Sequence, residues 1–376
     1  MMQIKPFELE RWFALYEFEV ENNMCASCAE ETSTGQLLEL AGSSKVEEYL
    51  NLPLNYIPNP GNARLRELIS ENYPGLKPEQ IQVTTGASEA ILLLMINLLE
   101  PGENLVVQYP IYQSLFSLAE SMKIEVKRWN LQDKNNFYWD VSDLKNLIDS
   151  KTKLIVINNP HSPTGSIMTL DQLQEIIRLA EKNGSFLLSD EVYYGLVYNQ
   201  NDLLPPAVTL SEQAISLGDM SKPYGLGGLR IGWLASHHKN LLAACSGLRD
   251  YTTMCSSAPS EFLAVIALEN KNKILNRKIS LARENLSLLE QFIQENGDIL
   301  SWTKPKGGVS AFPRYNLDLD SVQFCEGLIK RENTLLLPGS VFGLEYHFRI
   351  GFGKGKKDFR AGLNKIGRYL DFLRKK

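Results

Sequence analysis

Lys222 has the residue type and the local sequence of a reactive amine. It lies in the stretch SLGDMSKPYGLGGLRIGW, residues 216–233, between an apolar run and a glycine-rich turn. A lysine that the backbone holds away from bulk water becomes nucleophilic toward an aldehyde. A solvated loop lysine is the ordinary alternative for any single Lys-Pro pair. The rest of the chain must therefore decide between these two interpretations.

Two further segments have groups that suit an anion and a planar ring. Gly86-Ala87-Ser88-Glu89 precedes an apolar helical run, so its backbone N–H groups and the helix dipole favour an anion. The same residues could form an ordinary helix N-cap. Tyr112, in the run YPIY, could set its ring over a planar ligand or could be a core aromatic.

An acidic motif and a rigid turn add groups of the same kind. Asp190 and Tyr193 belong to the run SDEVY. A carboxylate there can keep a pyridine nitrogen protonated, and the tyrosine can reach the same ligand, although an N-cap role explains Asp190 almost as simply. The run NNPHSPTG, residues 158–165, must fix the backbone because of its prolines.

The elements that must position these residues are short strands. β-Branched runs alternate with helical patterns, which predicts an α/β fold with a largely parallel sheet covered by helices on both faces. The predicted strands are 81–85, 104–108, 124–129, 153–158, 185–189, 214–218 and 230–235. Ligands bind outside the carboxyl ends of such strands, and the candidate groups follow five of them. That recurrence favours one shared ligand site over separate core and cap roles.

In this order the motifs resemble those of the class I/II aminotransferases, pyridoxal phosphate enzymes of fold type I in the aspartate aminotransferase-like superfamily. The resemblance covers about residues 56–351. It implies pyridoxal 5′-phosphate as the cofactor and Lys222 as the catalytic lysine that forms an aldimine with it. It also implies that Asp190 pairs with the pyridine nitrogen and that Tyr193 bonds to the 3-hydroxyl. The remaining matches put Ala87, Ser88 and Arg230 on the phosphate and Tyr112 on the ring face.

The resemblance also implies a substrate clamp and a second subunit. Arg349, in FRIGFG, would bind the substrate carboxylate through two parallel hydrogen bonds, which a lysine could not copy. The run NYIPNPGNARLRELI matches a signature in which Tyr56 reaches the phosphate of the neighbouring subunit. A homodimer is therefore expected, with an amino acid and a 2-oxo acid as the small-molecule partners.

Two positions depart from the family pattern. Ser162 stands where most relatives have an Asn that donates to the 3-hydroxyl, so either Ser162 acts through water or Asn159 substitutes. Asp219 stands where relatives have a phosphate-binding Ser. Its charge would oppose phosphate unless it turns toward Arg230 or a backbone amide, and Ser221 then takes the phosphate contact.

The family fold implies two domains, in line with a length of 376 residues. We expect a large αβα domain over residues 46–280, which holds the cofactor on a mainly parallel seven-stranded sheet. A smaller α+β domain would be built from residues 1–45 and 281–376. A long charged helix over residues 269–296 should connect the two.

Composition excludes several other classes of protein. A net charge of −5 leaves no electrostatic footprint for nucleic acid or an acidic membrane, and the longest apolar run, 90–99, is too short to cross a bilayer. The acidic N-terminus does not resemble a signal peptide, so we expect a cytoplasmic protein. Five cysteines fit a reducing compartment, and we expect the CxxC of Cys25 and Cys28 to be incidental, with no metal site.

These observations predict an aminotransferase that moves an amino group between an amino acid and a 2-oxo acid. The same residues serve elimination and cyclisation, so a pyridoxal phosphate lyase or cyclase is the alternative. The run FELERWFALYEF resembles the start of the capreomycidine synthase-like subgroup, which favours that alternative. Glu17, Glu19 and Glu21 could receive a cationic substrate side chain or could form a solvated helix face. We do not expect a DNA-binding regulator, because the segment before Tyr56 is short and acidic for such a domain and its linker.

Overall fold

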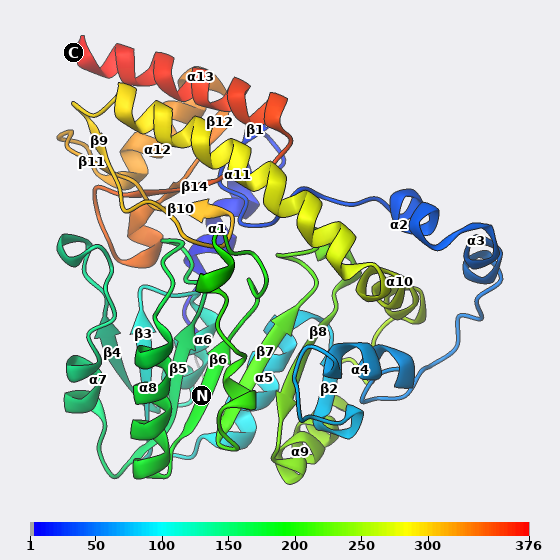
Figure 1. Ribbon diagram of the computed structural model, residues 1–376. Helices are drawn as coiled ribbons and strands as arrows, with labels where there is room; N and C mark the ends of the chain where they lie inside the picture. The colour runs from blue at the N-terminus through cyan, green and yellow to red at the C-terminus, as the bar shows by residue number, and fades with distance from the viewer. Residues whose placement is uncertain (1–3, 376) are drawn as a thin grey trace.

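A central seven-stranded sheet organises the chain, as the computed structural model shows for residues 4–375 (Figure 1). The strand order is β2-β8-β7-β6-β5-β3-β4. Strand β8 runs antiparallel to the other six, so its pairs with β2 and β7 are antiparallel and the remaining pairs are parallel. The strands are β2 (Ile81–Thr84), β3 (Asn104–Tyr109), β4 (Glu125–Asn130), β5 (Thr152–Asn158), β6 (Phe186–Asp190), β7 (Ala214–Asp219) and β8 (Gly232–Ser236). All seven predicted strands are confirmed, with ends that differ by up to two residues.

Helices cover both faces of this sheet, because the strand side chains that point to either face are apolar. Leu105 and Val107 face one cluster, whereas Val106 between them faces the other. The first face carries α5 (Gly86–Leu98), α6 (Ser114–Ser121) and α9 (Lys239–Arg249). The second carries α7 (Val141–Leu147) and α8 (Leu170–Asn183), and α4 (Ala63–Ser70) and α10 (Ala258–Glu269) pack at the β2–β8 end.

A long helix leads from the sheet to a second layer. The helix predicted over residues 269–296 is α11 (Lys271–Glu295), which starts later than expected because α10 ends at Glu269 and Asn270 leaves helical geometry. At 25 residues it is about 38 Å long. It packs against α13 (Lys356–Arg374), near α12 (Ser321–Glu332) and the sheet β10 (Ser310–Ala311), β14 (Phe348–Gly351) and β13 (Leu337–Pro338).

The N-terminal residues join both layers. α1 (Glu8–Tyr16) is followed by β1 (Asn22–Asn23), which pairs parallel with β12 (Thr334–Leu335) in the second layer. Further along, α2 (Thr34–Ala41) packs on α10 and is followed by α3 (Ser43–Leu50), so both lie beside the sheet layer (Figure 1). The strands β9 (Leu300–Ser301) and β11 (Arg314–Tyr315) form a separate pair. The division at residues 45 and 280 stays a prediction.

The architecture is the predicted α/β fold, with the strand ends that carry the candidate residues at one edge of the sheet. Within residues 4–375, no helix is both long and apolar enough to span a bilayer.

Candidate active site

Lys222 lies directly after β7, in a loop against which the N-terminal segment packs. Its amine donates hydrogen bonds to Ser27 Oγ at 3.1 Å and to Cys28 Sγ at 3.6 Å. Burial lowers the pKa of this amine, but the nearby Cys28 and Tyr193 raise it by more, so that the net pKa is raised. Tyr193 and Arg349, which lowers the pKa of the amine, are therefore within electrostatic range of Lys222.

Ser27 and Cys28 reach Lys222 because glycines let their segment approach closely. A Cβ at Gly225 would collide with the Glu30 carbonyl, and a Cβ at Gly353 would collide with the Cys28 carbonyl. Backbone hydrogen bonds then fix the segment, including the one from Ala29 N to Lys222 O at 2.9 Å. The sequence predicted no role for Cys28, and the CxxC motif is the signal that could have indicated one.

Asp190, the last residue of β6, is a buried carboxylate that requires a positive partner. Its side chain is 4% exposed, and Val192 N donates to its Oδ1 at 3.2 Å. Burial raises the pKa of Asp190 to about 7, helped by the negative Asp219 and opposed by Lys222. Because a buried charge is costly unless it is paired, a protonated ring nitrogen is a suitable ligand for this carboxylate.

The N-terminus of α5 and Arg230 form a surface that suits phosphate. Arg230 has a left-handed backbone with φ 53°, which aims its guanidinium toward Gly86. A Cβ at Gly86 would collide with that guanidinium, so this position needs a glycine. Arg230 Nη1 donates to Gly227 O at 3.0 Å and lies 3.5 Å from Ser221 Oγ. A helix N-terminus, a guanidinium and a hydroxyl together are a strong anion-binding set.

Asp219 turns its charge to backbone amides, one of the two orientations expected from the sequence. Its Oδ2 accepts from Ala87 N at 2.8 Å, and its Oδ1 accepts from Ser221 N. The carboxylate therefore caps α5 and braces the loop before Lys222. As a consequence, Ala87 N is engaged by Asp219, and Ser88, Ser221 and Arg230 are left as the groups that could receive phosphate.

Asn159 lies beside Asp190, whose carbonyl accepts from Asn159 N at 3.1 Å, but the side chain of Asn159 turns elsewhere. Its Oδ1 accepts from Met168 N at 3.1 Å, and its side chain lines a small cavity with Ser189 and Glu191. Successive side chains of an extended chain point to opposite sides, so Asn158, which pairs in register with Asp190, faces the site instead. Asn158 Oδ1 accepts from Ser162 N at 2.7 Å and thereby holds the proline-rich turn.

Tyr112 lies at the junction of α5 with the N-terminal helix α1. Its hydroxyl donates to Glu10 Oε1 at 3.3 Å, and its ring is 4.9 Å from that of Phe7. Burial and Glu10 raise the pKa of Tyr112, whereas Lys222 and a hydrogen bond from Ser88 lower it. The ring therefore lies between the anion-binding turn and Lys222.

Arg349 enters the site from β14 in the second layer. It is 3% exposed, and its Nε and Nη2 both donate to Cys25 O, at 3.2 and 3.0 Å. Its guanidinium lies 5.6 Å from the centre of the Phe342 ring. Because these two N–H groups share the Cys25 carbonyl, a carboxylate would bind through the N–H groups that remain on Nη1 and Nη2.

Acidic side chains of α1 reach the same site, and the sequence indicated them only in part. Burial and Glu10 raise the pKa of Glu17, and Lys222 and Arg349 lower it, so Glu17 faces the two cations. Glu21, in contrast, forms an exposed ion pair with Lys365 at 2.8 Å. Glu10 was missed, although its spacing of seven residues from Glu17 puts both on one helix face.

Tyr56 does not join the site within this chain. It lies between α3 and α4 and is 83% exposed. Leu54 beside it is 82% exposed. Both therefore present apolar surface to the outside of the subunit.

Comparison with known proteins agrees with this geometry. Residues 51–366 match the family model described as aminotransferase class I and II. The chain is 31% identical to capreomycidine synthase of Streptomyces vinaceus, over 96% of this chain and 93% of that protein. It is 28% identical to aspartate aminotransferase of Thermotoga maritima, over 81% of this chain and 79% of that protein.

Solved structures extend the likeness to the whole fold. A PLP-dependent aminotransferase from Streptococcus suis superposes with a TM-score of 0.94 at 31% identity, covering 99% of both chains. A PLP-dependent cyclase, OrfR, superposes with a TM-score of 0.90 at 28% identity, covering 99% of this chain and 98% of that one. With the family model spanning most of the sequence, the chain belongs to the class I and II aminotransferase family.

Proposed function

We propose that the protein is a pyridoxal phosphate-dependent aminotransferase that moves an amino group between an amino acid and a 2-oxo acid. The observation that carries this proposal is that Asp190 and Lys222 lie at the carboxyl ends of the adjacent strands β6 and β7, with Arg349 of β14 within electrostatic range of Lys222. Membership of the family supports the cofactor, which the related Streptococcus suis enzyme also uses.

The residues present fit this cofactor. Asp190 is a buried acid whose raised pKa reflects the lack of a neutralising charge, and a pyridinium would supply one. Ser88, Ser221 and Arg230 would hold the phosphate, with Tyr112 and Tyr193 beside the ring. When bound, pyridoxal phosphate supplies an aldehyde for attaching amines and a ring that withdraws electrons from the substrate α-carbon.

The chain's own groups then divide the work on the substrate. Arg349 binds the α-carboxylate, and this fixes which bond of the α-carbon is aligned for cleavage. Lys222 Nζ takes the proton from the α-carbon as a general base and, as a general acid, would deliver it to the carbon of the cofactor's aldehyde group. Ser27 and Cys28 contact Nζ and so limit where the amine can swing and how much water reaches it.

The cofactor assignment is tested by absorbance. Purified protein should show visible absorbance from lysine-bound cofactor, and Lys222→Ala should abolish it. Lys239→Ala, at the start of α9, is a control that should leave it unchanged. Absorbance that persists in Lys222→Ala would exclude this lysine as the attachment point.

Aminotransfer itself is tested by the need for an acceptor. Each amino acid is mixed with the enzyme, with and without a 2-oxo acid, and new oxo acid and ammonia are measured. Sustained turnover that requires the oxo acid supports aminotransfer. Ammonia release without an acceptor would instead support elimination.

A second candidate function, a lyase or cyclase acting on an amino acid with a cationic side chain, is favoured by the acidic residues of α1. Burial and Glu10 raise the pKa of Glu17, whereas Lys222 and Arg349 lower it, so Glu17 is within electrostatic range of both cations. The identity to capreomycidine synthase supports the same alternative. A carboxylate pair binds a guanidinium or ammonium group well, whereas it would repel an acidic side chain.

Glu17→Gln tests this substrate preference. Loss of one charge-assisted hydrogen bond, about 1.5–3 kcal/mol, should lower kcat/KM for arginine or lysine about 10- to 100-fold and leave methionine unchanged. Glu19→Gln is the matched control, because Glu19 is exposed in the turn that follows α1. An equal loss for methionine would show that Glu17 does not recognise charge.

We also propose a homodimer in which Tyr56 contributes to the partner's site. Exposed apolar side chains on this part of the surface include Leu50, Leu54, Tyr56 and Tyr251, and each is at least 75% exposed. Apolar surface of this kind marks interaction sites. Light scattering should give twice the chain mass of 42.4 kDa, and a monomer that retains full activity would refute the shared site.

A further inference from the structure

The CxxC motif at residues 25–28 lies against two cations of the active site. Cys28 Sγ lies 3.6 Å from Lys222 Nζ, and the carbonyl oxygen of Cys25 accepts from Nε and Nη2 of Arg349. Neither thiol takes part in the proposed reaction. Cysteines at this spacing are typical of redox chemistry, so the surroundings of each thiol decide what the motif can do.

The two thiols have different surroundings. Cys25 is 0% exposed in the apolar core, its Sγ lies 3.4 Å from Asn23 Oδ1, and burial raises its pKa to about 12. Cys28 is partly exposed, and its sulfur contacts the amine of Lys222. An oxidant from solvent therefore meets Cys28 before Cys25, and a nitrogen nucleophile is already beside the sulfur that it would oxidise.

Hydrogen bonds on both sides of Cys28 hold it next to the lysine. Ala29 N donates to Lys222 O at 2.9 Å, and Ser27 Oγ accepts from Lys222 Nζ at 3.1 Å. These two bonds bracket Cys28 along the chain. The sulfur and the nitrogen can therefore reach bonding distance by rotations about side-chain bonds, without movement of the two backbone segments.

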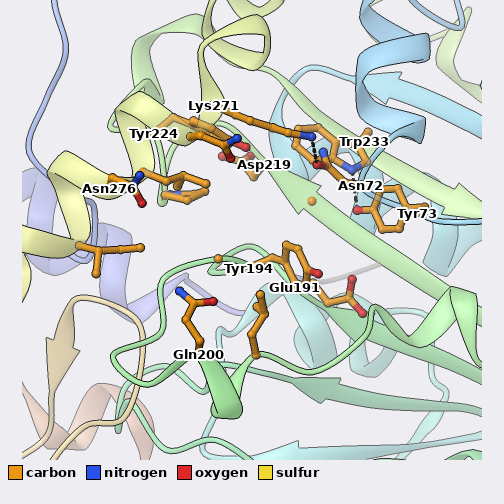
Figure 2. Close-up of a pocket in the computed structure, with 17 residues that line it drawn as sticks. Asn72, Tyr73, Glu191, Tyr194, Gln200, Asp219, Tyr224, Trp233, Lys271 and Asn276 are labelled. Carbon is orange, nitrogen blue, oxygen red and sulfur yellow. Dashed lines mark hydrogen bonds between the residues drawn. The ribbon is translucent and has the colours of Figure 1, made fainter.

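The amine of Lys222 is directed toward Cys28 and not into the neighbouring cavity. That cavity has a volume of about 230 Å³, and Asp219 and Tyr224 lie on its wall (Figure 2). Among the described residues 4–375, its lining includes these two neighbours of Lys222 in the sequence but not Lys222 itself. The lysine side chain extends instead to the segment that carries Cys28.

Oxidation of the thiol would also make the amine more reactive. Burial lowers the pKa of Lys222, and Cys28 is the largest of the influences that raise it, ahead of Tyr193. A protonated sulfenic acid has no charge, so forming one at Cys28 removes that raising influence while the burial remains. The amine then loses its proton more readily and becomes a nucleophile.

We propose that Cys28 and Lys222 form a reversible, redox-controlled covalent bond when the lysine amine is free of cofactor. Hydrogen peroxide transfers one oxygen atom to the Cys28 thiol, which is oxidised to a sulfenic acid as the peroxide is reduced to water. The amine attacks the sulfur, the S–O bond breaks, and the hydroxyl group leaves as water with a proton from the amine. The product is a sulfenamide with an S–N bond. Two molecules of a thiol reductant return the thiol and the amine and become a disulfide.

This bond would regulate the loading of the enzyme. While Lys222 is joined to Cys28, its nitrogen is not available to the aldehyde of pyridoxal phosphate, so oxidised cofactor-free protein would stay inactive until it is reduced. Formation of the bond needs only the two side chains and does not depend on which reaction the enzyme catalyses. Its effect on loading rests on the proposed attachment of the cofactor at Lys222.

Peptide mass spectrometry tests the bond. Cofactor-free protein treated with hydrogen peroxide and digested should give a peptide pair joined between Cys28 and Lys222, about 2 Da lighter than the two separate peptides together. Dithiothreitol should separate the pair. Protein loaded with pyridoxal phosphate before the treatment should give no joined pair, because the amine is occupied. A joined pair in the loaded protein would support the bond and count against cofactor attachment at Lys222, so the two proposals fail separately.

Variants identify the partners. Cys25→Ser should still form the joined pair, as should Cys255→Ser, which removes the other partly exposed cysteine. Cys28→Ser should abolish it, and Lys222→Ala should leave Cys28 as a sulfenic acid that dimedone captures. A disulfide between Cys25 and Cys28 in place of the joined pair would overturn the proposal. So would oxidation of Cys28 in the unaltered cofactor-free protein without a bond to Lys222.

Discussion

Replacing Gly86 with alanine should weaken cofactor binding through the phosphate. Gly86 has φ +75°, and a Cβ there would lie 2.9 Å from Arg230 Cζ and closer still to Nη2. The guanidinium is the end of a flexible side chain, so it would move away instead of forcing the backbone apart. The anion-binding surface would then lose one charge-assisted hydrogen bond.

The magnitude follows from two separate terms. A non-glycine residue in the left-handed region costs about 1–2 kcal/mol of folding free energy. Loss of a hydrogen bond from a charged donor costs about 1.5–3 kcal/mol of binding, which is about 10- to 100-fold in the dissociation constant. Urea unfolding measures the first term, and titration of the cofactor-free protein with pyridoxal phosphate measures the second.

Gly184→Ala provides the matched control. Gly184 caps α8 with φ +73°, and a Cβ there meets nothing within 4 Å. It should therefore lose the same folding free energy as Gly86→Ala and bind the cofactor normally. Unchanged cofactor affinity in Gly86→Ala, or an equal loss in Gly184→Ala, would refute the assignment of Arg230 to the phosphate.

Two further predictions concern buried charges. Because the pKa of Asp190 is raised to about 7, the folded state binds its proton more tightly than the unfolded state, and stability should be greatest below about pH 4 and should fall as the pH rises toward 7. Between pH 5 and pH 8 this loss is about 2.6 kcal/mol, and urea unfolding of cofactor-free Asp190→Asn should lack it; an unchanged pH profile would contradict the burial argument. Arg249 is fully buried and pairs with Glu89 at 3.2 Å. Replacing Arg249 with methionine should lower the free energy of unfolding by about 3–5 kcal/mol. The exposed Arg64→Met should have little effect by the same measurement, and similar losses in both variants would show that burial does not set the cost.

Local patterns were enough to predict the sheet. Each strand is a short apolar run between turn residues, and parallel strands buried on both faces need little long-range information to be recognised. The start of α11 was misplaced by two residues because its boundary depends on the geometry of Asn270, for which the sequence has no strong signal. Helix ends of this kind are the least certain part of any such prediction.

From the sequence, the site could be predicted only to the extent that residue types and the order of the strands determine it. Asp190 and Lys222 follow predicted strands, so their meeting at the carboxyl ends of the sheet could be expected. Arg349 lies in β14 of the second layer, and only the family resemblance indicated it. Whether Asn158 or Asn159 faces the site depends on the register of a single residue. The partners of Asp219 depend on where α5 begins relative to β7, which no local pattern specifies.

The sequence by itself determined the order of the strands along the chain, the chemistry available at their ends and the resemblance to a family of pyridoxal phosphate enzymes. Only the tertiary structure decided that Ser27 and Cys28 contact Lys222. The reason is physical. Strands and caps arise from neighbouring residues, whereas these contacts join segments about 200 residues apart and depend on close packing of the whole chain.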